Sequence, residues 1–216
     1  MLNAIKLYST SPPLDREVLV LSILKSMQDS FGALPVEFDI HGPYGIKKGS
    51  TVGFKAFQKK LEQKGHDGYY ALSGNTSDQF GFHLLLGARI GETSYSEIIV
   101  WYAPERFQVD FLSLSEPLLG PLNACCGFEI EIPADHMVTT ETRIRQSILG
   151  SISVDVSSKH LEWIQFIGRG DIRGPFRKTI VNGDQLKSIL AHTDATWKPT
   201  AHGLHYVHQP HAENRA

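Results

Sequence analysis

Cysteine is scarce in this 216-residue sequence, and long apolar runs are missing. The two cysteines, Cys125 and Cys126, are neighbours. Because a disulfide between adjacent residues is strained and rare, we expect both to be reduced, structural thiols in a reducing compartment. The N-terminus lacks a basic segment followed by a long apolar one, and no window approaches about 18 apolar residues. We therefore expect a cytoplasmic protein without a secretion signal, a transmembrane helix or a membrane partner.

An excess of charge of one sign is also missing. The sequence has 21 Lys and Arg residues against 23 Asp and Glu residues, a formal net charge of −2. A domain that binds duplex nucleic acid needs positive charge to attract phosphates, so no nucleic-acid partner is expected. Glycine and proline, at 19 and 11 residues, are too few for a low-complexity chain, and 41% apolar residues exclude a wholly disordered one.

Catalytic signatures are absent as well. The sequence has no G-x-S-x-G, H-E-x-x-H, C-x-x-C or G-K-[ST] motif. The Gly- and Arg-rich loop 168–178 could hold an anion or be a solvated turn, and the sequence leaves both readings open. Four histidines follow one another at a spacing of three near the C-terminus: His202, His205, His208 and His211. A metal site needs a rigid surrounding shell, which a terminal segment lacks, so we expect no metal and no cofactor.

Helix-period and strand-like segments are mixed along the chain. Links between the strand-like segments of residues 69–112 are too short for parallel crossovers, which favours antiparallel pairing. In the first expected helix, residues at helical spacing are Val18, Leu21, Leu24 or Lys25, and Gln28, and the apolar stripe is widened by Leu19, Ile23 and Met27. The fold class predicted is α+β, with a mixed, mainly antiparallel sheet flanked by about four helices. Helices are expected at about 14–30, 51–64, 115–125, 140–149 and 183–192.

Residues 1–199 are expected to form a single α+β domain, and residues 200–216 a flexible, His-rich tail. Two segments, LPVEFDI at 34–40 and FEIEI at 128–132, each follow a helix and alternate apolar with acidic residues. This echo allows two related halves, 1–112 and 113–199, although two unrelated half-buried strands would look the same.

Acidic side chains are expected on the outward faces of these two strands: Glu37, Asp39, Glu129 and Glu131. Two close carboxylates could do acid–base chemistry or hold Mg²⁺, but outward acids on a half-buried strand ordinarily keep that face soluble. Such a face would attract a partner with a basic cleft. We therefore predict these four residues as partner-binding and not as catalytic.

Two short segments resemble a known class of proteins. Phe31–Gly32–Ala33–Leu34–Pro35 forms a turn between an amphipathic helix and a strand, and IIVWYAP is an aromatic cluster in a strand-rich middle region. In these features the chain resembles the immunity proteins of bacterial polymorphic-toxin systems, which include contact-dependent and type VI secretion systems. The resemblance implies a protein that binds and blocks a cognate toxin in the cell that makes it.

Three classes of function remain open from the residues. A non-catalytic immunity-type binding protein is the prediction, with a protein toxin as partner and no enzymatic activity. The alternative is a small cytosolic enzyme whose site is assembled from distant carboxylates and arginines. Its candidate residues are Asp110, Glu129, Glu131, Arg143 and Arg173. The third is a scaffold component of a larger bacterial assembly.

Overall fold

The computed structural model describes most of the chain. The described residues are 1–13, 15–41, 52–61, 68–73, 80–90, 92–132, 142–146, 152–156, 167, 170 and 176–212. Four helices occur among them: α1 (Arg16–Phe31), α2 (Phe54–Leu61), α3 (Phe111–Leu122) and α5 (Gly183–Leu190). None of the helices in these ranges is long and apolar enough to cross a membrane.

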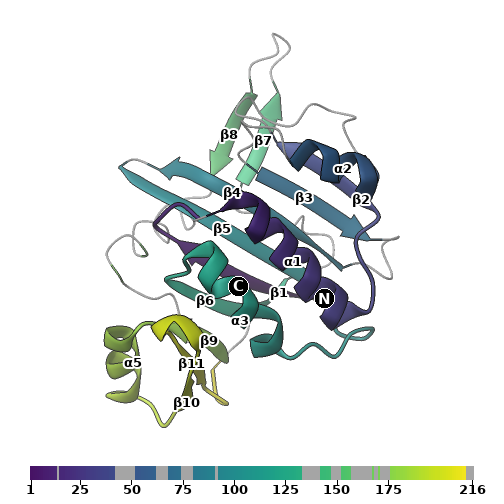
Figure 1. Cartoon of the computed structure of the whole chain (residues 1–216). Helices are drawn as coiled ribbons and strands as arrows, with labels where there is room; N and C mark the ends of the chain where they lie inside the picture. Colours follow the sequence, from purple (N-terminus) through teal and green to yellow (C-terminus); the bar gives the residue numbers. More distant parts are fainter. Residues whose placement is uncertain are drawn as a thin grey trace.

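One nine-stranded sheet organises the fold (Figure 1), and its strand order is β10-β11-β9-β6-β1-β5-β4-β3-β2. Every described strand pair is antiparallel, which confirms the predicted α+β class. A separate two-stranded sheet pairs β7 (Thr142–Gln146) with β8 (Ile152–Val156). The strands of the large sheet are β1 (Leu2–Ser9), β2 (Glu37–His41), β3 (Gly68–Ser73), β4 (Phe80–Ile90), β5 (Thr93–Tyr102), β6 (Cys126–Ile132), β9 (Lys178–Val181), β10 (Thr196–Pro199) and β11 (His205–His208).

Helices α1 and α3 pack against one face of this sheet and against each other (Figure 1). Asp15 begins α1 by accepting hydrogen bonds from the backbone N–H groups of Glu17 and Val18, and Gly32 ends it in the left-handed region at φ 70°. Leu19, Ile23 and Met27 are fully buried. The predicted stripe is correct at these three positions and wrong at Val18 and Leu21, which are 50% and 46% exposed.

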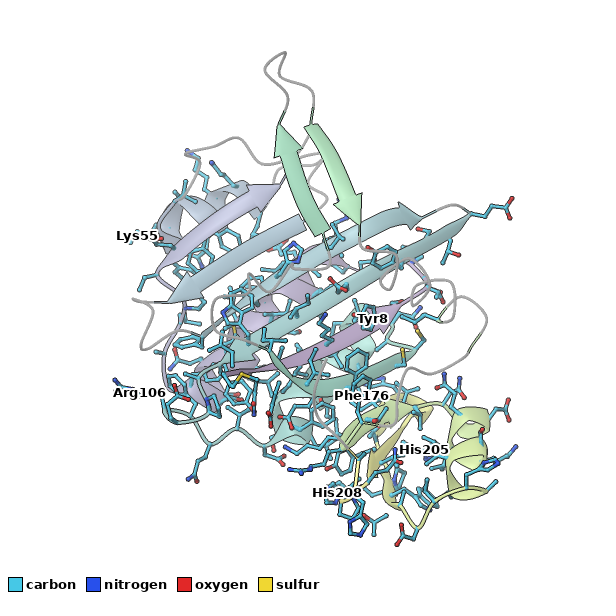
Figure 2. The ribbon with its side chains drawn as sticks, turned by 180° about the vertical axis from the view of Figure 1, so that it is seen from behind. Tyr8, Lys55, Arg106, Phe176, His205 and His208 are labelled. Atoms are coloured by element: carbon cyan, nitrogen blue, oxygen red, sulfur yellow. The ribbon has the colours of Figure 1, made fainter. Side chains whose placement is uncertain are left out.

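The opposite face of the sheet is also covered. Phe176 stacks on Phe128 with ring centroids 4.3 Å apart, and Tyr8 lies 5.9 Å from Phe128 on its other side. Figure 2 shows Tyr8 and Phe176 from this side of the molecule. Because both faces of its centre are buried, the sheet has little room for outward-facing charge in strands β1, β5 and β6.

Three local predictions are wrong. Residues 142–146 form strand β7 and not a helix, since Thr142, Ile144 and Gln146 alternate with arginines and pair with β8. Helix α3 begins at Phe111, inside the segment RFQVDFLSL that reads as a strand.

The third concerns the tail. Residues 205–208 are strand β11, inserted between β9 and β10, where they were expected to be flexible. Leu204 and Val207 explain this, because they are 6% and 0% exposed and supply the apolar contacts that hold the segment.

Both edges of the sheet are modified. The N–H of Phe38 in β2 donates to the carbonyl of Val52, and the N–H of Val52 donates back. At the other edge, the N–H of Thr200 donates to the carbonyl of Leu204. Because alternate residues of an antiparallel strand form hydrogen bonds to the neighbouring strand, the backbone groups of Trp197 and Pro199 face away from β11. Pro199 has no N–H to offer, so neither edge presents a full row of donors to another strand.

Candidate functional site

The four acidic residues predicted to bind a partner do not form one patch. Glu37 and Asp39 belong to the edge strand β2, while Glu129 and Glu131 belong to β6. Strands β1, β5, β4 and β3 lie between these two, which separates β2 from β6 by ~24 Å at the usual strand spacing. Glu37 is exposed and Glu131 partly exposed, and the side chain of Asp39 lies outside the described residues.

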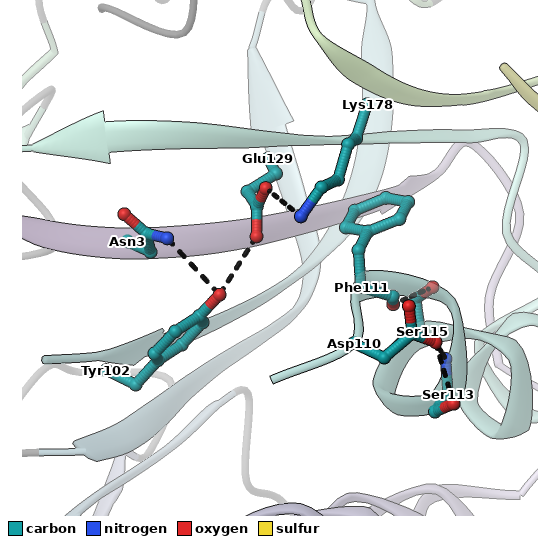
Figure 3. A network of polar contacts seen from close by, with 8 residues as sticks. All are labelled: Asn3, Tyr102, Asp110, Phe111, Ser113, Ser115, Glu129 and Lys178. Atoms are coloured by element: carbon teal, nitrogen blue, oxygen red, sulfur yellow. Dashed lines mark hydrogen bonds and ion pairs between the residues drawn. The ribbon is translucent and has the colours of Figure 1, made fainter. Parts of the chain in front are cut away.

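Glu129 is buried, so its predicted outward position is wrong. Its side chain is 2% exposed and points to the α3 side of the sheet, where β9 and α3 surround it. The Oε1 atom accepts a hydrogen bond from the hydroxyl of Tyr102 at 2.9 Å, and Oε2 lies 2.7 Å from Nζ of Lys178 (Figure 3). Both carboxylate oxygens therefore have partners inside the protein.

Tyr102 extends this network to a third neighbour. Its hydroxyl oxygen accepts a hydrogen bond from Nδ2 of Asn3 at 3.3 Å while its O–H donates to Glu129 (Figure 3). Burial, followed by the negative charge of Glu129, raises the pKa of Tyr102 well above its usual range, so the phenol stays protonated and remains a donor. The network ties β1, β5, β6 and β9 together through side chains, beyond the backbone ladder.

Asp110 has a separate structural task. It is the N-cap of α3, and its Oδ2 accepts hydrogen bonds from the backbone N–H of Ser113 at 2.8 Å and from its hydroxyl at 2.7 Å. The hydroxyl of Ser113 is the main cause that lowers the pKa of Asp110, with smaller contributions from the charges of Lys198 and Lys178. Because those two lysines act on it, Asp110 belongs to the same electrostatic neighbourhood as Glu129.

Replacing Asp110 by alanine is expected to lower the free energy of unfolding by about 1 kcal/mol at pH 7. Because folding lowers the pKa of this group, its contribution is present above the unfolded value of about 3.9 and is lost as the pH falls through the folded value. Urea unfolding of both proteins between pH 7 and pH 3 measures this. Asp110→Asn, which keeps the cap, should stay close to wild type at pH 7. A constant Asp110→Ala difference over the whole pH range would contradict the assignment.

Of the residues proposed for the alternative enzyme site, Asp110 and Glu129 share one electrostatic neighbourhood, but both make structural contacts. The carboxylate of Glu129 is occupied by a hydrogen bond from Tyr102 and an ion pair with Lys178, and Asp110 is the N-cap of α3. Arg143 lies on β7 in the separate small sheet, and Arg173 is outside the described residues. Of the Gly- and Arg-rich loop 168–178, the structure describes Gly170 and residues 176–178, and Lys178 is the partner of Glu129.

The C-terminal histidines do not share one side of an extended tail. His205 and His208 lie three residues apart on β11, which places them on opposite faces of the sheet. Figure 2 shows them within the C-terminal β-hairpin. Where the chain is described, no group of three or more His, Cys, Asp or Glu side chains is arranged to hold a metal ion.

Among the described residues, strand β10 carries the most exposed aromatic side chain. All four of its residues are exposed, and Trp197 is 48% exposed. The Trp197 ring meets His205 edge-on with ring centroids 5.3 Å apart, and Nζ of Lys198 lies 5.6 Å from the centroid of the Tyr206 ring. The side chains of Trp197 and Lys198 are therefore each oriented by a neighbour on β11, on opposite faces of the hairpin. We call Trp197 and His205 the hairpin surface.

Sequence comparison identifies no family, since neither a family model nor a curated protein matches this chain. A structural match exists among solved proteins. A structure described as Pseudomonas aeruginosa T6SS protein PA0821 superposes with a TM-score of 0.56 at 13% sequence identity. The match covers 99% of this chain and 70% of that one. At this level of identity the likeness shows a shared fold.

Proposed function

We propose that this chain is a non-catalytic binding protein of the immunity type, which binds and occludes a cognate bacterial toxin in the cytoplasm. The observation that carries the proposal is the fold, which matches a T6SS protein over 99% of this chain. T6SS denotes the type VI secretion system, one of the systems to which the sequence resemblance points. Neither nucleic acid nor a membrane is part of the proposal.

The burial of the Glu129 carboxylate and its pairing inside the protein support binding over catalysis. A catalytic carboxylate must reach a substrate, and Glu129 is 2% exposed with both oxygens already paired. Its contacts join four strands, which is a structural task. Glu129 is therefore withdrawn from the proposed interface, while Glu37, Asp39 and Glu131 remain in it as separate acidic contacts.

The hairpin surface supplies the apolar anchor that a tight complex needs. Tryptophan is enriched among the residues that dominate binding energy, because a large rigid ring loses much water-exposed area on contact. Trp197 is 48% exposed and already oriented by His205. Since Pro199 removes a donor from the outer edge of β10, side chains and not strand addition make the proposed contact.

Co-expression with any toxin-domain protein whose gene is found to adjoin the gene for this chain tests the proposal. The expected result is restored growth and a stoichiometric complex on size-exclusion chromatography, with no chemical change to the toxin. Trp197→Ala is expected to weaken the complex about 30-fold, corresponding to about 2 kcal/mol. Leu21→Ala, which trims a side chain of similar exposure on α1, is the matched control and should leave affinity unchanged.

Charge reversal separates the acidic contacts from the anchor. Glu131→Lys and Glu37→Lys, made one at a time, should slow association and reduce its dependence on salt. Unchanged rates in both variants would remove the acidic part of the proposal and leave the anchor standing. Multiple-turnover modification of the toxin by the purified protein would overturn the proposal as a whole.

A further inference from the structure

The two cysteines lie closer together than their place in the sequence requires. Successive side chains of an extended strand point to opposite faces. Cys126 begins β6, but Cys125 sits in a bend just before it, and the two Sγ atoms are 4.0 Å apart. Both side chains pack against the same apolar cluster on the sheet face that carries Tyr8 and Phe128.

The backbone holds this arrangement from both sides. The N–H of Cys125 donates to the carbonyl of Tyr8 at 2.8 Å, and Cys126 pairs with Tyr8 in the β1–β6 ladder. Just before the cysteines, Asn123 ends α3 in the left-handed region at φ 58°, and the hydroxyl of Ser9 donates to its carbonyl at 2.7 Å. The two sulfurs are thus positioned before any ligand arrives.

Access is uneven between the two thiols. Cys126 is 2% exposed, whereas Cys125 is partly exposed and offers the point of entry. The hydrogen bond with Cys126 is the main cause that lowers the pKa of Cys125, and the pKa of Cys126 is raised by that same contact and by burial. The thiol of Cys125 therefore ionises first and forms the first bond to a ligand. The thiol of Cys126 lies beside it and can form the second bond.

We propose that Cys125 and Cys126 form a vicinal dithiol site that chelates one soft, thiophilic metalloid centre, of which a trivalent arsenical is the representative. In the reaction with an arsenoxide, two S–As bonds form and the As=O bond breaks. Both thiol hydrogens leave with the oxygen as one molecule of water, and no atom is oxidised or reduced. Chelation suits this site better than a disulfide, because a bond of about 2.05 Å would require the backbone at the start of β6 to move.

Titration of the reduced, full-length protein with phenylarsine oxide tests the site. We expect one phenylarsine per chain in the native mass spectrum, with both thiols protected from maleimide. Excess 2,3-dimercaptopropanol should release the adduct, and the same concentration of a monothiol should not. Because the second S–As bond forms within one molecule, Cys125→Ala and Cys126→Ala should each weaken binding by about 100-fold or more.

Folding controls keep the test decisive. Circular dichroism reports whether each variant is folded, and Cys125→Ala decides the result if the buried Cys126→Ala variant is unstable. Wild-type affinity in a folded Cys125→Ala variant would overturn the proposal. So would two arsenicals on one wild-type chain, since each thiol would then react independently. Neither outcome affects the proposed toxin binding, which is measured separately.

Discussion

Replacing Glu129 by alanine is expected to lower the free energy of unfolding by about 3 kcal/mol. The change removes the partner of Lys178 and leaves the buried hydroxyl of Tyr102 without its acceptor. Breaking a fully buried ion pair costs about 3–5 kcal/mol. The side chain of Lys178 is 27% exposed, so its ammonium can turn toward water when Glu129 is removed. We therefore expect a loss at the lower end of that range. Urea unfolding followed by circular dichroism measures the loss.

A matched control lies two residues away on the same strand. Glu131→Ala removes a partly exposed carboxylate from β6 and should change stability by no more than about 0.5 kcal/mol. The double variant Glu129→Met with Lys178→Met, which removes both charges, should recover part of the loss because no buried charge is left alone. Equal losses for Glu129→Ala and Glu131→Ala would show that the network does not stabilise the sheet.

The buried position of Glu129 also shows where the sequence stops being informative. The alternation in FEIEI correctly predicts that Phe128 and Ile130 share one face and that Glu129 and Glu131 share the other. The pattern cannot reveal that Glu129 is buried on the second face, because its partner Lys178 comes from β9, far along the chain. Lys178, which opens a short apolar strand, is the sequence feature that could have indicated a buried acidic partner.

For other elements, the predictions that depend on local properties of the chain are correct, and those that depend on tertiary contacts are wrong. The α+β class and the antiparallel order follow from short links between strands, which are local properties. Strand β11 could not be predicted from its sequence His-Tyr-Val-His, because Val207 is its single aliphatic residue and its pairing with β9 and β10 is a tertiary feature. In α1 the helical period is correct and Leu19, Ile23 and Met27 are buried as expected, but Val18 and Leu21 are apolar and exposed.

Of the candidate site, the sequence could predict only that Glu37 and Glu131 are at least partly exposed, and their role in binding stays a prediction. The hairpin surface depends on the cross-strand contact of Trp197 with His205, which follows from the pairing of β10 with residues of the tail that was expected to be flexible. The dithiol site depends on a bend at Cys125 that brings adjacent side chains together. Both are tertiary features, and neither leaves a periodic signal in the sequence.

Replacing Phe57 by alanine is expected to lower the free energy of unfolding by about 3 kcal/mol and to melt helix α2. An isolated helix of eight residues is unstable in water, so α2 depends on its packing. Phe57 supplies most of that packing, because it is fully buried and stacks on Phe38 with ring centroids 4.3 Å apart. Phe38 in turn anchors the edge strand β2 through its backbone bridge to Val52.

Hydrogen exchange locates this effect and urea unfolding measures its size. In Phe57→Ala the amides of residues 57–61 should lose protection, while those of β1 and β5 at the centre of the sheet should keep theirs under native conditions. Lys55→Ala, an exposed change on the same helix, is the control and should shift stability by no more than about 0.5 kcal/mol. Retained protection over α2 in a folded Phe57→Ala variant would mean that contacts other than the Phe38–Phe57 stack hold the helix against the sheet.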